Sequence, residues 1–323
     1  MRILAAGSIF VFLCTFTAAQ EAPSAEFKIL ESIYSGKFSD SEKMLDTLSG
    51  EATPEKKLLE IFLLRWKEIP VVYSSASGAY LQMLLNLERI LDAPDDRRET
   101  VYYRICAYLF LSEYYTSSGD QWLAAKAARD AYPLVMKCFD DSVSSPEYNF
   151  VKGLYLYYAD YFSSYTVGGK ILFPFIKKGN AASGLDLLAD VAFSKSMAGT
   201  EAAIYLAHIL LHHQKKSRDA LAVCEKLANR YPANIKFQEL LAEAFLAAGE
   251  YEKAIPVVNR LKGDPHDYYH AAGYLFEGIL EEEFYKNPKK ARACYSQSIS
   301  SGEVYKNVSG QYIQQAEERL GGL

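Results

Sequence analysis

Small and apolar residues recur along this chain with a spacing of four and then three residues. Ala254, Val258 and Leu261 follow this spacing, and an equivalent triplet begins 34 residues earlier at Ala220. Residues spaced in this way lie on one face of an α-helix, because the helix repeats every ~3.6 residues. The pattern predicts amphipathic helices that recur with a period close to 34 residues.

Glycine residues mark several of the turns between these helices. Gly36, Gly119 and Gly249 each come just before a predicted helix that carries the repeated spacing. Glycine is common in such turns because it adopts positive φ angles without a steric penalty. Residues 303–320 form a last, polar helix, which suits the end of a repeat array. We therefore predict about seven helix pairs and a C-terminal capping helix.

The interval between units is longer near the C-terminus. Ala291 corresponds to Ala254 of the preceding unit, but it follows after 37 residues rather than 34. We expect the additional residues in the turn around Lys286, Asn287 and Pro288.

The small residue, the two apolar residues and a closing proline such as Pro232 together resemble the tetratricopeptide repeat (TPR). The resemblance is specific over residues 200–300 and looser over residues 22–195. It implies an all-α, right-handed α-solenoid in which the first helix of each pair lines a concave surface. The family favours a large residue such as Trp where this chain has Ile204 and Gln238. Because the concave positions are mostly apolar or acidic, we do not expect the basic carboxylate clamp of some TPR domains.

The N-terminus has the pattern of a secretory signal peptide. Arg2 precedes an uncharged apolar run, and small residues end at Ala19, where signal peptidase requires them. We predict a signal peptide over residues 1–20 and a single mature domain over residues 21–323, in the periplasm or secreted. An uncleaved N-terminal anchor is the alternative, although the run is shorter than the ~20 residues that cross a bilayer.

Composition narrows the possible partners and the chemistry. The net charge of −5 gives no basic stripe for nucleic acid, so we expect no nucleic-acid partner.

Cys106, Cys138, Cys224 and Cys294 follow the leader, and an oxidising compartment would allow a disulfide between the first two. Buried free thiols are the alternative for all four. No nucleophile, phosphate-loop or dinucleotide motif is present, so we predict no enzyme and no cofactor.

The predicted concave surface is rich in aromatic residues at its centre and acidic towards the C-terminus. Tyrosine offers a large, rigid contact area and a hydroxyl group, which suits recognition of a peptide or a glycan. The alternative is that the tyrosines fill the superhelix and the glutamates form a solvated face. His208 and His212 have helical metal-ligand spacing, but no third ligand is evident and we expect no metal. The predicted groove residues are Phe150, Leu154, Tyr157, Tyr158, Tyr205, Ile209, His212, Glu239 and Glu243.

Residues 163–179 interrupt one unit with an insertion that is apolar in its middle and basic at its end. It is either a loop that covers the groove or an apolar plug against neighbouring helices. We predict a non-enzymatic scaffold of the cell envelope that binds an unidentified protein or peptide in the concave groove. The alternative is a small-ligand-binding accessory protein, associated with transport, with its pocket under residues 163–179.

Overall fold

The computed structural model describes residues 24–48, 53–91, 97–142, 144–165 and 177–323. The regular elements in these ranges are all helices, so the all-α class predicted from the sequence is confirmed. The predicted signal peptide lies outside the described residues, as do residues 166–176 of the insertion.

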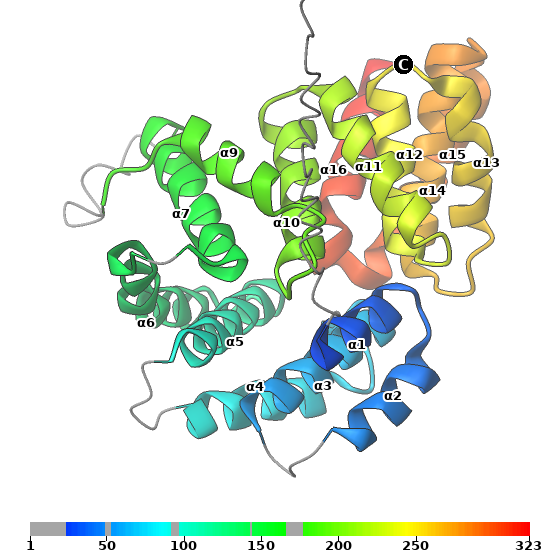
Figure 1. Ribbon diagram of the computed structural model, residues 1–323. Helices are drawn as coiled ribbons and strands as arrows, with labels where there is room; N and C mark the ends of the chain where they lie inside the picture. The colour runs from blue at the N-terminus through cyan, green and yellow to red at the C-terminus, as the bar shows by residue number, and fades with distance from the viewer. Residues whose placement is uncertain (1–23, 49–52, 92–96, 143, 166–176) are drawn as a thin grey trace, which may run out of the picture.

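The helices pack in sequential pairs along the chain (Figure 1). The earlier pairs are α1 (Ala25–Tyr34) with α2 (Phe38–Thr47), α3 (Pro54–Lys67) with α4 (Ser77–Leu91), α5 (Arg98–Ser117) with α6 (Gln121–Asp140), and α7 (Pro146–Tyr165) with α9 (Ala181–Val191). The later pairs are α10 (Gly199–His208) with α11 (Ser217–Arg230), α12 (Ile235–Ala247) with α13 (Tyr251–Lys262), and α14 (Tyr268–Ile279) with α15 (Pro288–Gly302). Helix α16 (Lys306–Gly322) follows them at the C-terminus, where the capping helix is predicted.

In two of the later pairs, the first helix is extended by a π-helical turn. Turn η2 (Ile209–His213) continues α10, and turn η3 (Leu280–Phe284) continues α14. Residues 285–287, which follow η3, form a turn as long as residues 248–250 between α12 and α13. The prediction of a longer turn near Pro288 is therefore wrong. The additional residues lie in the helix, where a π-helical turn accommodates insertions.

The glycines expected at turns have the backbone conformation that requires them. The φ angles of Gly36, Gly119 and Gly249 are 73°, 88° and 76°. Lys215 and Lys286 have φ angles of 54° and 55° just after the two π-helical turns, in the same left-handed region. A side chain is strained there, so these two lysines occupy positions that favour glycine.

The repeated small and apolar positions face inward as predicted. Ala254, Val258 and Leu261 are at most 1% exposed. Between α7 and α9 the backbones come so close that a Cβ atom on Gly184 would lie 2.7 Å from the backbone nitrogen of Tyr157. The small residue therefore permits the close helix crossing on which each unit depends.

The array does not stay open, because its first unit folds back onto the later helices (Figure 1). Glu31 of α1 forms an ion pair with Arg230 of α11, with 3.0 Å between Oε2 and Nη2. The Tyr34 hydroxyl donates to Glu201 Oε1 of α10 at 2.8 Å, and Asn234 Nδ2 donates to the Tyr34 carbonyl at 3.0 Å. We call this set of interactions the closure contact. It brings residues about 200 positions apart into one buried interface.

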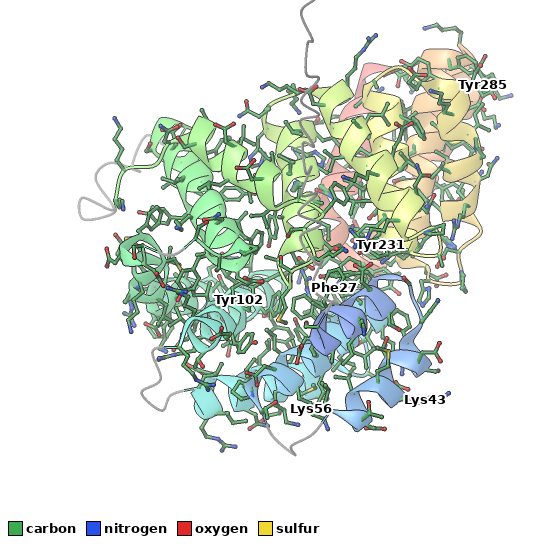
Figure 2. The ribbon with its side chains drawn as sticks, in the orientation of Figure 1. Phe27, Lys43, Lys56, Tyr102, Tyr231 and Tyr285 are labelled. Carbon is green, nitrogen blue, oxygen red and sulfur yellow. The ribbon has the colours of Figure 1, made fainter. Side chains whose placement is uncertain are left out.

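An aromatic cluster fills the closure contact. The Tyr34 ring lies 5.2 Å from Trp66, 5.7 Å from Tyr231 and 6.4 Å from Phe237, measured between ring centroids. Figure 2 shows Phe27 of α1 close to Tyr231 at the same junction. Such ring pairs stabilise an interface beyond the area they bury.

The four cysteines in the described part of the chain are free and buried. Cys106 and Cys138 form no disulfide with each other, and Cys224 and Cys294 are also free thiols. The structure therefore agrees with the alternative of buried thiols.

Candidate functional site

Two cavities lined by described residues lie on the inner side of the curled array. The first, the central cavity, has a volume of about 430 Å³ and lies between α3, α4 and α5 on one side and α10, α12, α14 and α16 on the other. The second, the C-terminal groove, has a volume of about 740 Å³ and lies between η2, α12, α14 and α16. Lys236 lines the central cavity and Glu243 lines the C-terminal groove, and buried Glu239 lies between them on α12.

The partition between the two cavities is a buried polar bridge. Lys236 Nζ contacts the carboxylate of Glu239, which is 2% exposed. The Tyr312 hydroxyl of α16 donates to the other oxygen of Glu239 at 2.7 Å. Because both oxygens have partners, the buried carboxylate is compensated and the bridge is held firmly.

The central cavity is walled mainly by aromatic and aliphatic side chains that come from both halves of the chain. Large flat rings provide a rigid apolar surface on which a ligand buries area at little entropic cost. The aromatic residues of the wall are Trp66, Tyr80, Phe110, Tyr114, Tyr205 and Tyr268.

Arg65 places a charge in this wall, and two carboxylates compensate it. The guanidinium donates from Nη2 to both oxygens of Glu113 at 2.9 Å and lies 4.0 Å from Glu201 Oε1. Its carbon Cζ also lies 5.0 Å from the centroid of the Phe110 ring, a cation–π contact. Arg65 comes from the last turn of α3, where the helix dipole favours a cation.

Glu201 is the most buried charged group of the cavity, at 6% exposure. It lies in the first turn of α10, where the helix dipole favours an anion. Burial raises the pKa of this carboxyl above its ordinary value, although Arg65 and the Tyr34 hydroxyl oppose the rise. Glu201 therefore joins the closure contact to the cavity wall.

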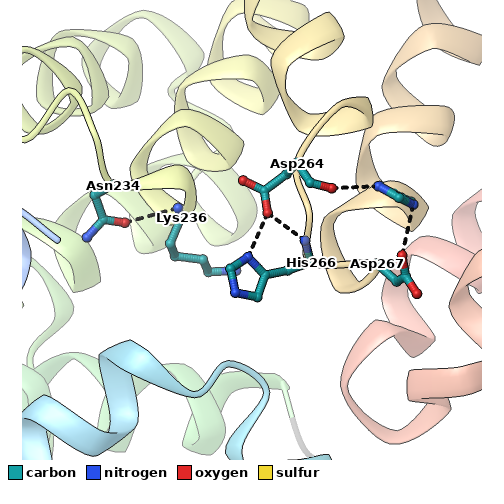
Figure 3. Close-up of polar contacts among 6 residues, drawn as sticks. Asn234, Lys236, Asp264, His266 and Asp267 are labelled. Carbon is teal, nitrogen blue, oxygen red and sulfur yellow. Dashed lines mark hydrogen bonds and ion pairs between the residues drawn. The ribbon is translucent and has the colours of Figure 1, made fainter. Parts of the chain in front are cut away.

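Local side-chain hydrogen bonds order the start of α12, which carries Lys236, and the turn before α14, which carries Tyr268. The side-chain oxygen of Asn234 accepts the backbone N–H of Lys236 at 3.0 Å (Figure 3). In the turn before α14, Asp264 Oδ1 accepts the backbone N–H of His266 at 2.9 Å and lies 2.8 Å from its Nδ1 atom (Figure 3). The Asn234 side-chain cap supplies a partner for a helix-terminal N–H group.

The C-terminal groove is more polar. His212 Nε2 lies 3.5 Å from Glu243 Oε2 on one wall. Burial raises the pKa of Glu243 to about 7 and lowers the pKa of His212 to about 4. Arg319 of α16 pairs with Glu283 at 2.8 Å on the opposite wall. The groove thus presents hydrogen-bonding groups of both kinds.

The predicted groove residues fall into three sets. Four are buried at 4% exposure or less and hold the helices together, so in this structure they offer no surface to a partner: Phe150, Tyr157, Ile209 and Glu239. Leu154 and Tyr158 are half-buried on α7. Tyr205 lines the central cavity, whereas His212 and Glu243 line the C-terminal groove.

Sequence reasoning missed the residues that contribute most to the central cavity. Arg65, Glu113 and Tyr114 lie within residues 22–195, where the resemblance to the repeat is looser, and Glu201 is a single acid at a helix start. The high tyrosine content, 25 residues, is the one signal in the sequence that pointed to an aromatic interior.

Comparison with known proteins agrees with the repeat assignment for part of the chain. Residues 211–275 match the tetratricopeptide repeat family model. The matched span contains α12 and the last three residues of η2, and so includes His212, Lys236 and Glu243 of the two cavities. No curated protein matches the chain. Among solved structures, a chain described as "Structure of phAimR-Ligand" matches at 12% identity and a TM-score of 0.34, covering 92% of this chain and 87% of that chain.

Two properties of the described ranges concern membranes and metal ions. Within them, no helix combines the length and the apolar character that crossing a bilayer requires. The same residues contain no group of three or more His, Cys, Asp or Glu side chains arranged to hold a metal ion.

Proposed function

We propose that this chain is a non-enzymatic protein- or peptide-binding protein of the cell envelope, and that its central cavity receives an apolar or aromatic side chain of the partner. The observation that carries the proposal is the cavity of about 430 Å³ with its wall of six aromatic residues. The TPR match over residues 211–275 supports it, because helical repeats of this kind commonly present an inner surface to partners.

The chemistry of the wall favours an apolar anchor. Arg65 is already bound by Glu113 and lies near Glu201, and Lys236 is already bound by Glu239, so the fixed charges have partners within the protein. A ligand therefore gains most by covering aromatic surface, at roughly 25 cal/mol per Å² of apolar area. Anchoring by one buried aromatic or aliphatic side chain is typical of interface hot spots.

The C-terminal groove offers a separate surface for another segment of the partner, because the bridge of Lys236, Glu239 and Tyr312 divides it from the central cavity. Its volume of about 740 Å³ and its mixed polar lining suit a peptide backbone, which both donates and accepts hydrogen bonds. His212 and Glu243, predicted from the sequence as groove residues, lie on this wall.

A small apolar molecule is the second candidate for the central cavity, as in a transport-associated ligand-binding protein. The cavity volume favours it, since small-molecule sites typically measure about 300–1,000 Å³. The cavity lies beneath residues 69–72 rather than beneath the insertion. The alternative pocket under residues 163–179 falls largely outside the described residues.

Placement in the envelope rests on the N-terminal pattern alone. Cell fractionation and N-terminal sequencing of the native protein test it. A mature N-terminus at Gln20 or Glu21 in the extracytoplasmic fraction supports the proposal, and full-length protein in the cytoplasm contradicts it.

A photo-crosslinking amino acid at Val72, in the cavity wall, tests the binding site in cells. The matched control carries the same amino acid at Val304, which is 67% exposed and does not line the cavity. We expect a covalent protein or peptide adduct at position 72 that is absent at position 304. A small-molecule adduct at position 72 supports the second candidate, and equal labelling at both positions contradicts both.

A further inference from the structure

Residues 69–76, between α3 and α4, form one wall of the central cavity. Ile69, Pro70, Val71 and Val72 line it, and η1 (Val71–Tyr73) forms the middle of the segment. Two backbone hydrogen bonds lie within the segment, from the Tyr73 N–H to the Pro70 carbonyl and from the Ser74 N–H to the Val71 carbonyl, and at the start of α4 the Ser77 N–H donates to the Ser74 carbonyl. The two hydrogen bonds within the segment hold its local conformation with no partner from the rest of the chain.

Tyr73 connects this wall to the C-terminal part of the chain. The backbone N–H of Asn307 donates to the Tyr73 hydroxyl at 3.4 Å, and the Tyr73 and Tyr305 rings meet edge to face at 5.8 Å. Tyr305 meets Tyr268 of the cavity wall in the same way, also at 5.8 Å. Val72 and Val308 line the cavity next to these contacts, so the Tyr73 contact lies at the edge of the cavity.

This contact is much weaker than the closure contact. A hydrogen bond of 3.4 Å is longer than the usual 2.7–3.2 Å, and the Tyr73 side chain is 42% exposed. The closure contact uses a charged pair, Glu31 with Arg230, and a buried hydrogen bond to Glu201. Local opening begins where few buried contacts hold a segment, so the array opens at Tyr73 before it opens at α1.

We propose that residues 69–76 are a lid on the central cavity, which opens when Tyr73 separates from Tyr305 and Asn307. The lid controls access to the cavity whatever the ligand is, so the proposal goes beyond the binding function. Removing the Tyr73 ring leaves the segment held by the apolar packing of Ile69 and Val71 and by its two ends, and it shifts the equilibrium towards the open form.

Thiol labelling measures this opening without any ligand. The reporter is Ile204→Cys in the cavity wall, with Ser117→Cys on the opposite wall as a second reporter, and the probe is N-ethylmaleimide. The native thiols give little background because they are buried, and burial raises the pKa of Cys106 and Cys138 to about 12.

We expect Tyr73→Ala to speed labelling at both cavity reporters by about fivefold, the factor expected for loss of an edge-to-face ring pair. Tyr73→Phe, which keeps the ring, should stay close to the parent rate. Tyr285→Ala, which removes an aromatic ring that is 51% exposed and remote from the cavity, should change nothing.

Two results overturn the lid. One is a labelling rate in Tyr73→Ala equal to the parent rate at both reporters. The other is an equal acceleration at the native Cys224, a fully buried thiol that does not line the cavity, which would indicate general loosening of the fold. Because no partner takes part, failure here leaves the crosslinking result at Val72 to decide the binding function.

Discussion

Replacing Tyr34 with Phe removes one hydroxyl from the closure contact and leaves the ring in place. That hydroxyl donates to Glu201 Oε1 at 2.8 Å, and the carboxylate is 6% exposed. Arg65 stays 4.0 Å away, too far to take over the hydrogen bond. The variant therefore leaves a buried carboxylate with one partner fewer.

The expected loss of stability is about 2 kcal/mol at pH 7, since a hydrogen bond to a charged group contributes ~1.5–3 kcal/mol. The loss should shrink on acidification. Burial raises the pKa of Glu201, and Tyr34 opposes that rise, so the variant pKa is higher still. Below the folded-state pKa the carboxyl is neutral, and a neutral hydrogen bond is roughly half as strong. The variant therefore loses stability relative to the parent as pH rises through the pKa of Glu201.

Urea unfolding at pH 7 and at pH 4.5 measures both effects, with the slope checked for constancy. Tyr269→Phe is the matched control, because that tyrosine is 2% exposed and its hydroxyl makes no hydrogen bond in the described part of the chain. If Tyr34→Phe costs no more than Tyr269→Phe at pH 7, the closure contact does not stabilise the fold as argued. A loss that is independent of pH would refute the role of the Glu201 charge.

Three further substitutions test separate features by thermal or urea unfolding. Lys286→Gly should stabilise the protein by about 1 kcal/mol, because φ is 55° there, whereas Lys43→Gly inside α2 should destabilise it by a similar amount. Ala254→Leu should cost about 1–3 kcal/mol more than the same change at exposed Ala247, and equal effects would mean that the repeat register is wrong. Glu243→Gln should stabilise the protein, because it removes a carboxylate whose charged form is disfavoured by burial. The gain is complete above pH 7, since burial raises the pKa of Glu243 to about 7. That gain should disappear as pH falls towards 4.5, the ordinary value, and a gain unchanged at pH 4.5 would contradict the assigned shift.

The helix pairs could be predicted because the contacts that define them are local. Ala254, Val258 and Leu261 pack within one unit and against its neighbour, so each contact lies within a few tens of residues. The turn glycines could be predicted for the same reason, since φ at Gly249 depends on the residues beside it. The π-helical turn η3 could not, because a four-then-three pattern looks the same whether additional residues enter a helix or a turn.

The candidate site could be predicted only in part. Helical periodicity and the repeat register predict Tyr205, His212 and Glu243 on the inner side, and these three residues line the two cavities. Periodicity cannot tell how strongly the array curves, and strong curvature buries Tyr157 and Glu239 completely or nearly so.

By itself the sequence determined an all-α array of paired helices and the face that each helix turns inward. Tertiary structure alone decided that α1 returns to α10, α11 and α12, and that Arg65, Glu113 and Glu201 meet in one wall. The reason is geometric. The rotation between neighbouring units is small and accumulates along the array, so a contact such as Tyr34 with Glu201, 167 residues apart, depends on every unit between them.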